Sequence, residues 1–234
     1  MTEQLFDKSY VLNFLPARYL HDSWWENIKD GKELQLLSRK SEAEVSVSKL
    51  ILEHFDLKDS PLLKFDTPQQ KISLLSPYEL TKFVMLLGLV SVCDQIKQTI
   101  TKVDVVDFKN QLGVDMYNFA IEQATSMYHQ IPTLTQSSLD MRKPLNAQVF
   151  ANGLIILGRA INDEDKALVT RLVLKLGKAS FSYLSDRSQL TAYKKSSCVK
   201  LIELLTDHFN SNLNNVEAGN TSDLDQGVIN EEDN

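Results

Sequence analysis

Residues 76–93 read SPYELTKFVMLLGLVSVC, and this stretch determines how we expect the rest of the chain to fold. Ser76 is a typical N-cap residue, Pro77 suits the first turn of a helix, and Glu79 stands three residues after the cap. The residues that follow are apolar on more than one side of the helix: Leu80, Phe83, Val84, Leu86, Leu87, Leu89, Val90 and Val92. A helix that is apolar nearly all round lies inside a core. The sequence therefore predicts a buried central helix, too short and too soon followed by charged residues to span a bilayer.

The composition is that of a helical globular protein. The 234 residues are enough for one large domain or two small ones with a sizeable core. Gly and Pro are scarce, with 8 and 6 residues, which favours helices over a sheet-rich fold. No secretory leader is recognisable at the start, so we do not expect a secreted precursor. Cys93 and Cys198 lie in apolar helical stretches, which indicates buried free thiols in a reducing cytosol.

The net charge of −6 comes from the last part of the chain. From Ser211 onward there is no Lys or Arg, and the acidic residues are Glu217, Asp223, Asp225, Glu231, Glu232 and Asp233. The rest is nearly neutral and has no basic stripe for a phosphate backbone, which argues against nucleic-acid binding. We expect a helical domain over residues 1–210 and a disordered acidic tail over 211–234, because the tail has few apolar residues. The tail either solvates the protein or binds a basic partner.

Apolar residues at helical spacing predict an all-α fold, a single globular domain of roughly eight to ten helices around the central one. Residues 32–55 read as one or two helices, the second starting near Ser41, and residues 96–100 as a continuation of the central helix or a second helix. Further helices are expected at 104–112, 114–129, 145–161, 163–176 and 189–209. Asp104 and Asp163 are the expected N-caps of two of them, and Gly113 is an expected helix end. Residues 56–76 and 131–144 contain prolines and read as loops, of which the first is either a surface loop or a hinge. No repeat is strong enough to predict a solenoid.

The N-terminal segment combines a stretch expected to be extended with an aromatic cluster. Residues 10–14, YVLNF, favour an extended conformation, and Pro16 suits the first position of a short helix. The aromatic cluster consists of Tyr19, Leu20, Trp24 and Trp25. One interpretation is a hydrophobic flap that closes over the core. The other is an exposed anchor for a protein partner, because Trp and Tyr dominate interface hot spots. The four residues are therefore our candidate partner-binding site.

No arrangement of residues predicts a catalytic, cofactor or metal site. The histidines are scattered, without a second His or Cys at ligand spacing: His21, His54, His129 and His208. The sequence contains no Gly-rich phosphate-binding loop and no nucleophile elbow. Asp163, Glu164 and Asp165 read as the acidic first turn of a helix, where their side chains diverge. We therefore expect a protein that is not an enzyme, and an all-α active site of unrecognised type is the remaining alternative.

The order of several short segments resembles the SctK family of type III secretion systems, the group of YscK, PscK, OrgA and MxiK. The segments are FLPARYLH at 14–21, LGLV at 87–90, an apolar helix that ends in an acidic turn, TRLVLKLG at 170–177 and KKSSCVKLIELL at 194–205. The most specific residues are Phe14, Pro16, Tyr19, Leu20 and His21, together with Leu87, Gly88, Leu89 and Val90. The likeness covers most of residues 10–209 and leaves out the acidic tail.

The resemblance implies a helical, non-enzymatic, cytoplasmic component of the sorting platform, peripheral at the cytosolic face of the bacterial inner membrane and not inserted into it. Members of this family link the cytosolic domain of the inner-membrane ring protein SctD to the pod protein SctQ, which connects through SctL to the SctN ATPase. The expected function is an adaptor between an SctD-like and an SctQ-like partner, without a cofactor. The alternative is a type III secretion chaperone or substrate-binding protein. Small chaperones need a sheet, however, and translocator chaperones need tetratricopeptide repeats, which the sequence does not show.

Overall fold

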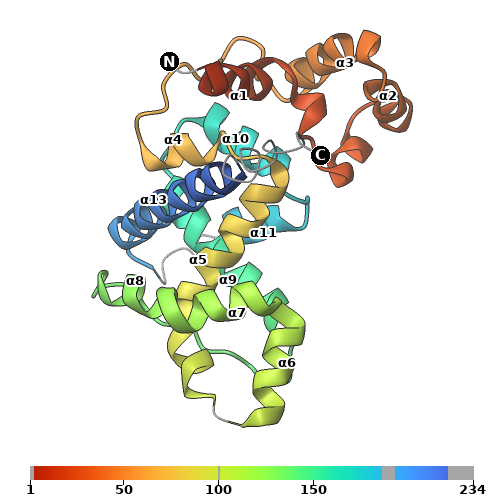
Figure 1. Cartoon of the computed structure of the whole chain (residues 1–234). Helices are drawn as coiled ribbons and strands as arrows, with labels where there is room; N and C mark the ends of the chain where they lie inside the picture. Colours follow the sequence, from red (N-terminus) through yellow and green to blue (C-terminus); the bar gives the residue numbers. More distant parts are fainter. Residues whose placement is uncertain (1–2, 100, 186–192, 221–234) are drawn as a thin grey trace, which may run out of the picture.

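The computed structural model describes residues 3–99, 101–185 and 193–220 of the chain. Over these ranges the protein consists of twelve α-helices and three short 3₁₀ or π turns, and it has no β-strand (Figure 1). The predicted all-α fold is confirmed. More helices form than expected, partly because the predicted helix at 114–129 is divided and partly because the predicted loop at 56–76 contains a short helix.

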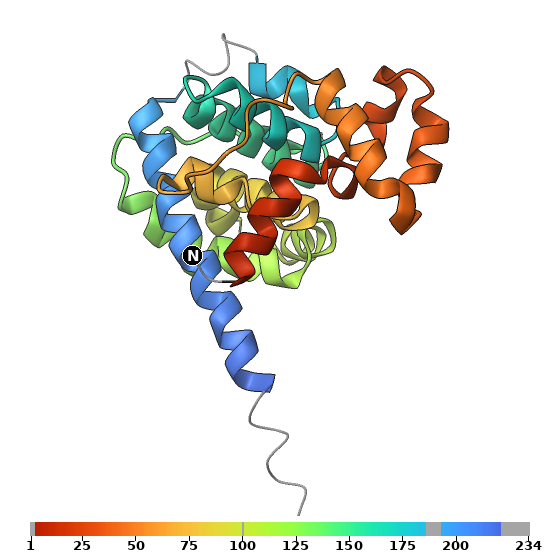
Figure 2. The ribbon, with the colours of Figure 1, turned by 90° about the horizontal axis from the view of Figure 1, so that it is seen from above.

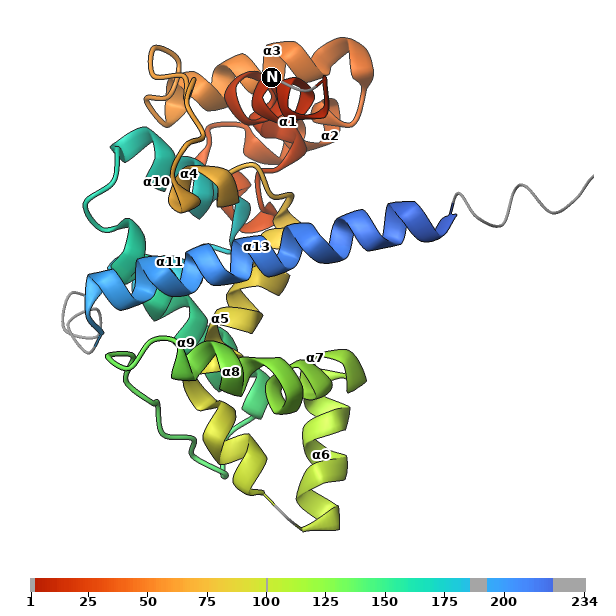
Figure 3. The same ribbon diagram turned by 60° about the vertical axis from the view of Figure 1, so that its left-hand side comes forward.

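The helices form an N-terminal layer, which we define as residues 3–65, and a body that comprises the rest. The layer lies at one end of the molecule, and helix α6 (Lys102–Leu112) lies at the other end (Figures 1 and 3). The layer contains α1 (Glu3–Phe14), η1 (Pro16–Arg18), η2 (Asp22–Asn27), α2 (Gly31–Ser38) and α3 (Ser41–His54). The body contains α4 (Pro68–Ile72), α5 (Pro77–Gln98), α6 (Lys102–Leu112), α7 (Val114–Phe119), η3 (Ala120–Ala124), α8 (Thr125–His129), α9 (Leu145–Ile161), α10 (Lys166–Lys175), α11 (Ser180–Ser185) and α13 (Lys195–Asn220).

Helix α5 is the buried central helix that the sequence predicts. The Ser76 hydroxyl accepts the amide N–H of Glu79 at 3.3 Å, and the Glu79 carboxylate accepts the Ser76 amide at 2.7 Å, so the predicted capping box is present. The side chains from Leu86 to Cys93 are all buried, on every side of the helix. The thiols of Cys93 and Cys198 are free and buried, as predicted. The largest hydrophobic cluster of the protein surrounds this helix.

Helices α5 and α9 approach so closely that only glycine fits at their contact. A Cβ atom on Gly88 would lie 1.8 Å from the carbonyl oxygen of Val149, and one on Gly153 would lie 1.9 Å from the carbonyl oxygen of Val84. Each helix thus presents a glycine to the backbone of the other. The close contact buries the apolar side chains on both sides of the crossing and fixes the position of α9 on the central helix.

A second, smaller hydrophobic cluster attaches the N-terminal layer to α10. The layer contributes residues that include Leu12, Trp25 and Leu57, and α10 contributes Ala167 and Leu174. Trp24 and Leu62 are packed against both clusters. The layer is therefore held to the body chiefly through one helix, α10, and through the residues that bridge the two clusters.

The first helix corrects the prediction of an extended stretch at residues 10–14. These residues form the second half of α1 (Glu3–Phe14). Leu12 is buried on one side, while Phe6, Tyr10 and Phe14 follow one another at intervals of four residues on the exposed side. Helical spacing thus outweighs the strand preference of Tyr, Val and Phe, which depends strongly on context. Pro16 begins the short helix η1, as predicted.

The structure also differs from the prediction at two N-caps and at one helix end. Thr101, not Asp104, caps α6, because its hydroxyl accepts the Asp104 amide N–H at 3.2 Å. Asp165, not Asp163, caps α10 by accepting the Ala167 amide N–H at 2.7 Å. Helix α13 extends to Asn220, into the stretch assigned to the acidic tail (Figure 2). The rest of the predicted tail, 221–234, lies outside the described residues, as do residues 189–192 of the predicted last helix.

Candidate functional site

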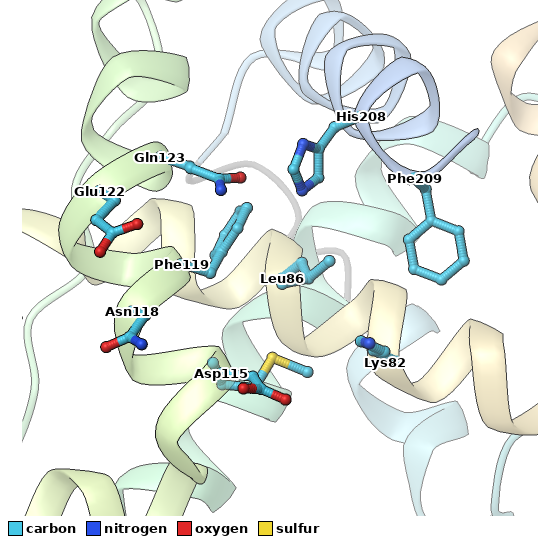
Figure 4. A pocket seen from close by; sticks show the side chains of 10 residues that line it. Lys82, Leu86, Asp115, Asn118, Phe119, Glu122, Gln123, His208 and Phe209 are labelled. Atoms are coloured by element: carbon cyan, nitrogen blue, oxygen red, sulfur yellow. The ribbon is translucent and has the colours of Figure 1, made fainter. Parts of the chain in front are cut away.

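A groove on the body runs between α5, α7 and α13. It consists of two adjoining pockets of about 360 and 370 Å³, which share Lys82 from α5 and Asp115 and Met116 from α7. Helix α13 closes one end of the groove with His208 and Phe209 (Figure 4). Three elements that are far apart in the sequence therefore contribute to one concave surface.

A tight corner between α6 and α7 positions the α7 wall of this groove. Gly113 ends α6, as predicted, with φ 83°, a conformation that glycine adopts without strain. Its amide N–H donates to the Lys109 carbonyl at 2.9 Å. The Lys109 ammonium also lies 5.1 Å from the centre of the Tyr117 ring on α7, a cation–π contact across the corner. The corner therefore brings the exposed side chain of Val114 to the rim of the groove.

The chain continues from α7 through η3, a wide turn of π-helix, into α8. Ala120 and Ala124 of this turn are buried beside α5, while Glu122 and Gln123 are exposed. Turns of this kind are rare, and they are frequent at functional sites. Here the turn keeps Phe119 buried against the core and places two polar side chains at the edge of the groove.

The groove has an apolar floor and a polar rim. Leu86 and Phe119 are buried in the floor, where the Phe119 ring lies 5.6 Å from the His208 ring (Figure 4). Burial lowers the pKa of His208, which favours the neutral form of its imidazole. The exposed polar side chains of the rim are Lys82, Asp115, Asn118, Glu122 and Gln123. An apolar centre inside a polar rim is typical of surfaces that bind other proteins.

The four predicted partner-binding residues lie together in the N-terminal layer, away from this groove. Tyr19, Leu20 and Trp25 are buried, and Trp24 is half-buried with its indole N–H donating to the Leu176 carbonyl at 2.8 Å. Burial favours the alternative interpretation of a flap that closes over the core. A partner could contact only the exposed part of Trp24 in this arrangement, and the binding role of the four residues stays a prediction.

Sequence reasoning missed two buried cations on α10. The Arg171 guanidinium donates to the carbonyls of Leu12, Leu57 and Ala167, each at 3.3 Å. The Lys175 ammonium donates to the carbonyls of Ser73 and Leu75 at 2.5 and 2.6 Å. The spacing contained a signal, because both residues fall on the side of α10 that also carries buried Leu168 and Leu172. Both cations are bound by backbone carbonyls and not by carboxylates, so they join segments of chain together.

We expect Lys175 to make the stability of the protein rise with pH above neutrality. Burial lowers the pKa of its ammonium from 10.5 to about 7, opposed by Glu79 and assisted by Lys8. Between these two values the unfolded chain binds a proton that the folded chain lacks, so the free energy of unfolding increases, by at most about 1.4 kcal/mol per pH unit. Urea unfolding of the wild type and of Lys175→Met from pH 6 to pH 9 measures this contribution. It is contradicted if the difference between the two proteins does not change with pH.

The remaining chemistry of the structure is sparse. Among the described residues, no group of three His, Cys, Asp or Glu side chains is placed to hold a metal ion. None of the helices within those ranges has the length and apolar character needed to cross a membrane.

Comparison with known proteins identifies a family to which the chain is similar. The family model described as "YOP proteins translocation protein K (YscK)" matches residues 7–209, which is most of the chain. No curated protein and no solved structure matches the chain. The matched range includes the N-terminal layer almost from its start, the central helix and the groove, and it ends at Phe209, which closes one end of the groove.

Proposed function

The chain belongs to the YscK family of type III secretion proteins, and we propose that within the secretion apparatus it acts as a non-enzymatic cytoplasmic adaptor. The adaptor would link the cytosolic domain of an SctD-like inner-membrane ring protein to an SctQ-like pod protein. Through the pod it would connect indirectly to SctL and to the SctN ATPase. It would lie at the cytosolic face of the bacterial inner membrane, held there by its partner.

The observation that carries this proposal is the groove between α5, α7 and α13. Its lining includes Met116 and Phe209, whose half-buried side chains are available to an incoming apolar residue. Methionine side chains are flexible and adapt to the shape of what they bind. The charged groups of the rim, Lys82, Asp115 and Glu122, have no ion pair among the described residues and are free to pair with a partner. The groove thus supports recognition of a protein.

An experiment with two acidic substitutions tests this proposal. Tyr78 and Val114 lie on the rim with 78% and 58% of their surface exposed, each in the first turn of a helix, where an acidic side chain does not disturb folding. We expect Tyr78→Glu combined with Val114→Glu to weaken binding to one partner at least about ten-fold, because charge would enter an apolar contact. Co-purification and light scattering with the SctD-like cytosolic domain and the SctQ-like protein of the same locus measure binding.

Val103→Glu is the matched control. Val103 is 77% exposed, also in the first turn of a helix, and it does not line the groove. This variant should bind both partners as the wild type does. A wild-type chain that forms no complex with either protein would contradict the adaptor proposal. If it instead formed a defined complex with an exported substrate, the chaperone alternative would replace it.

A further inference from the structure

Helix α1 presents apolar side chains on two opposite sides, which is unusual for a helix at the surface. Its inner side packs Leu12 into the second hydrophobic cluster. Its outer side carries Phe6, Tyr10 and Phe14, which are 61%, 45% and 47% exposed. A surface helix normally has a polar outer face. We call these three residues the α1 stripe.

The α1 stripe forms a continuous row. Its residues are spaced four apart, so they lie above one another on one face of the helix. The rings of Tyr10 and Phe14 are already in contact, with their centres 5.3 Å apart. Seen from above, no other described helix crosses over α1 (Figure 2). All three side chains are among the large apolar residues that are exposed in the described part of the chain, so the chain itself leaves the row uncovered.

The charges beside the α1 stripe are acidic and unpaired. Glu3 and Asp7 are exposed on the same helix, and no ion pair of the described residues involves either of them. The nearby cations are engaged elsewhere. Lys8 is half-buried and lines two pockets on the inner side of α1, one of which Asp7 also borders. Arg18 is bound to Glu44 through two contacts, at 2.7 and 2.8 Å.

We propose that the α1 stripe docks a protein partner whose contact face is apolar and carries lysine or arginine side chains. The three aromatic rings supply the apolar contact, since aromatic residues are enriched at interface centres. Glu3 and Asp7 supply charges that a basic partner complements and that an acidic partner would meet as like charges. A second copy of this chain fits less well, because it would bring Glu3 and Asp7 against another acidic face. The inference rests on the proposed adaptor function and gives it a second surface, separate from the groove.

Two sets of variants test the inference on the full chain, with the SctD-like cytosolic domain and the SctQ-like protein as probes. Phe6→Gln combined with Tyr10→Gln removes the apolar contact and keeps good helix formers. It should weaken binding of one probe about ten-fold or more and leave the other unchanged. Leu36→Gln is the matched control, because Leu36 is exposed in the same layer but lies on α2. It should bind both probes normally.

The second set tests the charge. Glu3→Gln combined with Asp7→Asn should slow association with the same probe and reduce its dependence on salt. Glu26→Gln with Glu33→Gln removes the same charge from exposed positions of the layer that are not on α1, and should have little effect on either quantity. Circular dichroism of each variant confirms that it is folded.

Each outcome decides between distinct conclusions. If the wild type binds a probe and the α1 variants bind both probes equally well, the inference is wrong and the adaptor proposal stands. If the wild type binds neither probe, the proposed function fails and this inference fails with it. The wild type could instead form a concentration-dependent dimer that Phe6→Gln combined with Tyr10→Gln abolishes. This result would show that a second copy of the chain covers the α1 stripe, and it would contradict the proposal of a basic partner.

Discussion

Alanine at Gly88 should destabilise the protein by about 3 kcal/mol, at the upper end of what overpacking a core costs. The new methyl group would lie 1.8 Å from the Val149 carbonyl oxygen, which belongs to the backbone of α9 and cannot rotate away. The helices must separate, and the apolar residues on both sides of the crossing then lose contacts. Alanine normally stabilises a helix relative to glycine by about 1 kcal/mol. A large loss of stability in Gly88→Ala would therefore show that the clash at the helix crossing outweighs this preference. Urea unfolding followed by circular dichroism measures it.

Gly177→Ala is the matched control for this prediction. The same methyl group would there meet the His21 imidazole at 3.3 Å, a surface side chain that can move, so the change in stability should stay within about 1 kcal/mol. Gly153→Ala should resemble Gly88→Ala, and the double variant should lose less than the sum of the two, because either methyl group already forces the helices apart. A Gly88→Ala protein as stable as the wild type would contradict the close crossing.

The central helix could be predicted because its signals are local. Ser76, Pro77 and Glu79 identify its start within four residues, and the apolar run from Leu80 shows that it is buried. The first helix was missed because residues 10–14 were read by strand preference. The four-residue spacing of Phe6, Tyr10 and Phe14 was the better signal. Preferences of single residues are weak evidence, whereas spacing reports which side of an element meets the core.

The N-caps of α6 and α10 were predicted a few residues away from their true positions. In each case two candidate residues stand close together, Thr101 with Asp104 and Asp163 with Asp165. Which of them caps the helix depends on where the first turn starts, and this is decided by the hydrogen bond that each hydroxyl or carboxylate reaches. Element types are therefore easier to predict than their ends.

The groove could not be predicted from the sequence, because its residues come from three elements. Apolar residues at helical spacing predicted a helix at 114–129, and the structure places two of these residues, Met116 and Phe119, at the groove. Nothing in the sequence shows that Phe209 of α13 and Lys82 of α5 lie beside them. Their proximity follows from the crossing of α5 with α9 and from the corner at Gly113, which are tertiary features.

The two buried cations illustrate the opposite case, in which a charge obscured a correct pattern. Leu168, Arg171, Leu172 and Lys175 follow the spacing of a core-facing helix side. Charged residues are almost never fully buried unless they are paired, so such positions are easily assigned to the surface. Here backbone carbonyls from the N-terminal layer and from the segment after α4 accept the hydrogen bonds of the two cations. No local sequence pattern indicates these long-range contacts.

Alanine at Arg171 should loosen the N-terminal layer before the body unfolds. Arg171 is completely buried and connects α10 to the carbonyls of Leu12 and Leu57. Its removal leaves a cavity and takes one hydrogen-bond donor from each of the Leu12 and Leu57 carbonyls, which together should cost about 3 kcal/mol or more. Both tryptophans, Trp24 and Trp25, belong to the layer, so their fluorescence reports on it separately from the helix signal of the whole chain. In urea, the midpoint measured by fluorescence should fall below the midpoint measured by circular dichroism.

Two further variants separate the causes of this effect. Arg171→Met keeps most of the volume and loses the hydrogen bonds, so its cost should be smaller than that of alanine and shows how much of the loss is packing. Arg18→Ala breaks the exposed ion pair with Glu44 in the same layer and should cost less than about 1 kcal/mol. If the two midpoints of Arg171→Ala fell together, the layer and the body would unfold as one unit. If neither midpoint moved, Arg171 would not be what attaches the layer to α10, and the second hydrophobic cluster would hold the layer in place together with hydrogen bonds such as that from Trp24 to Leu176.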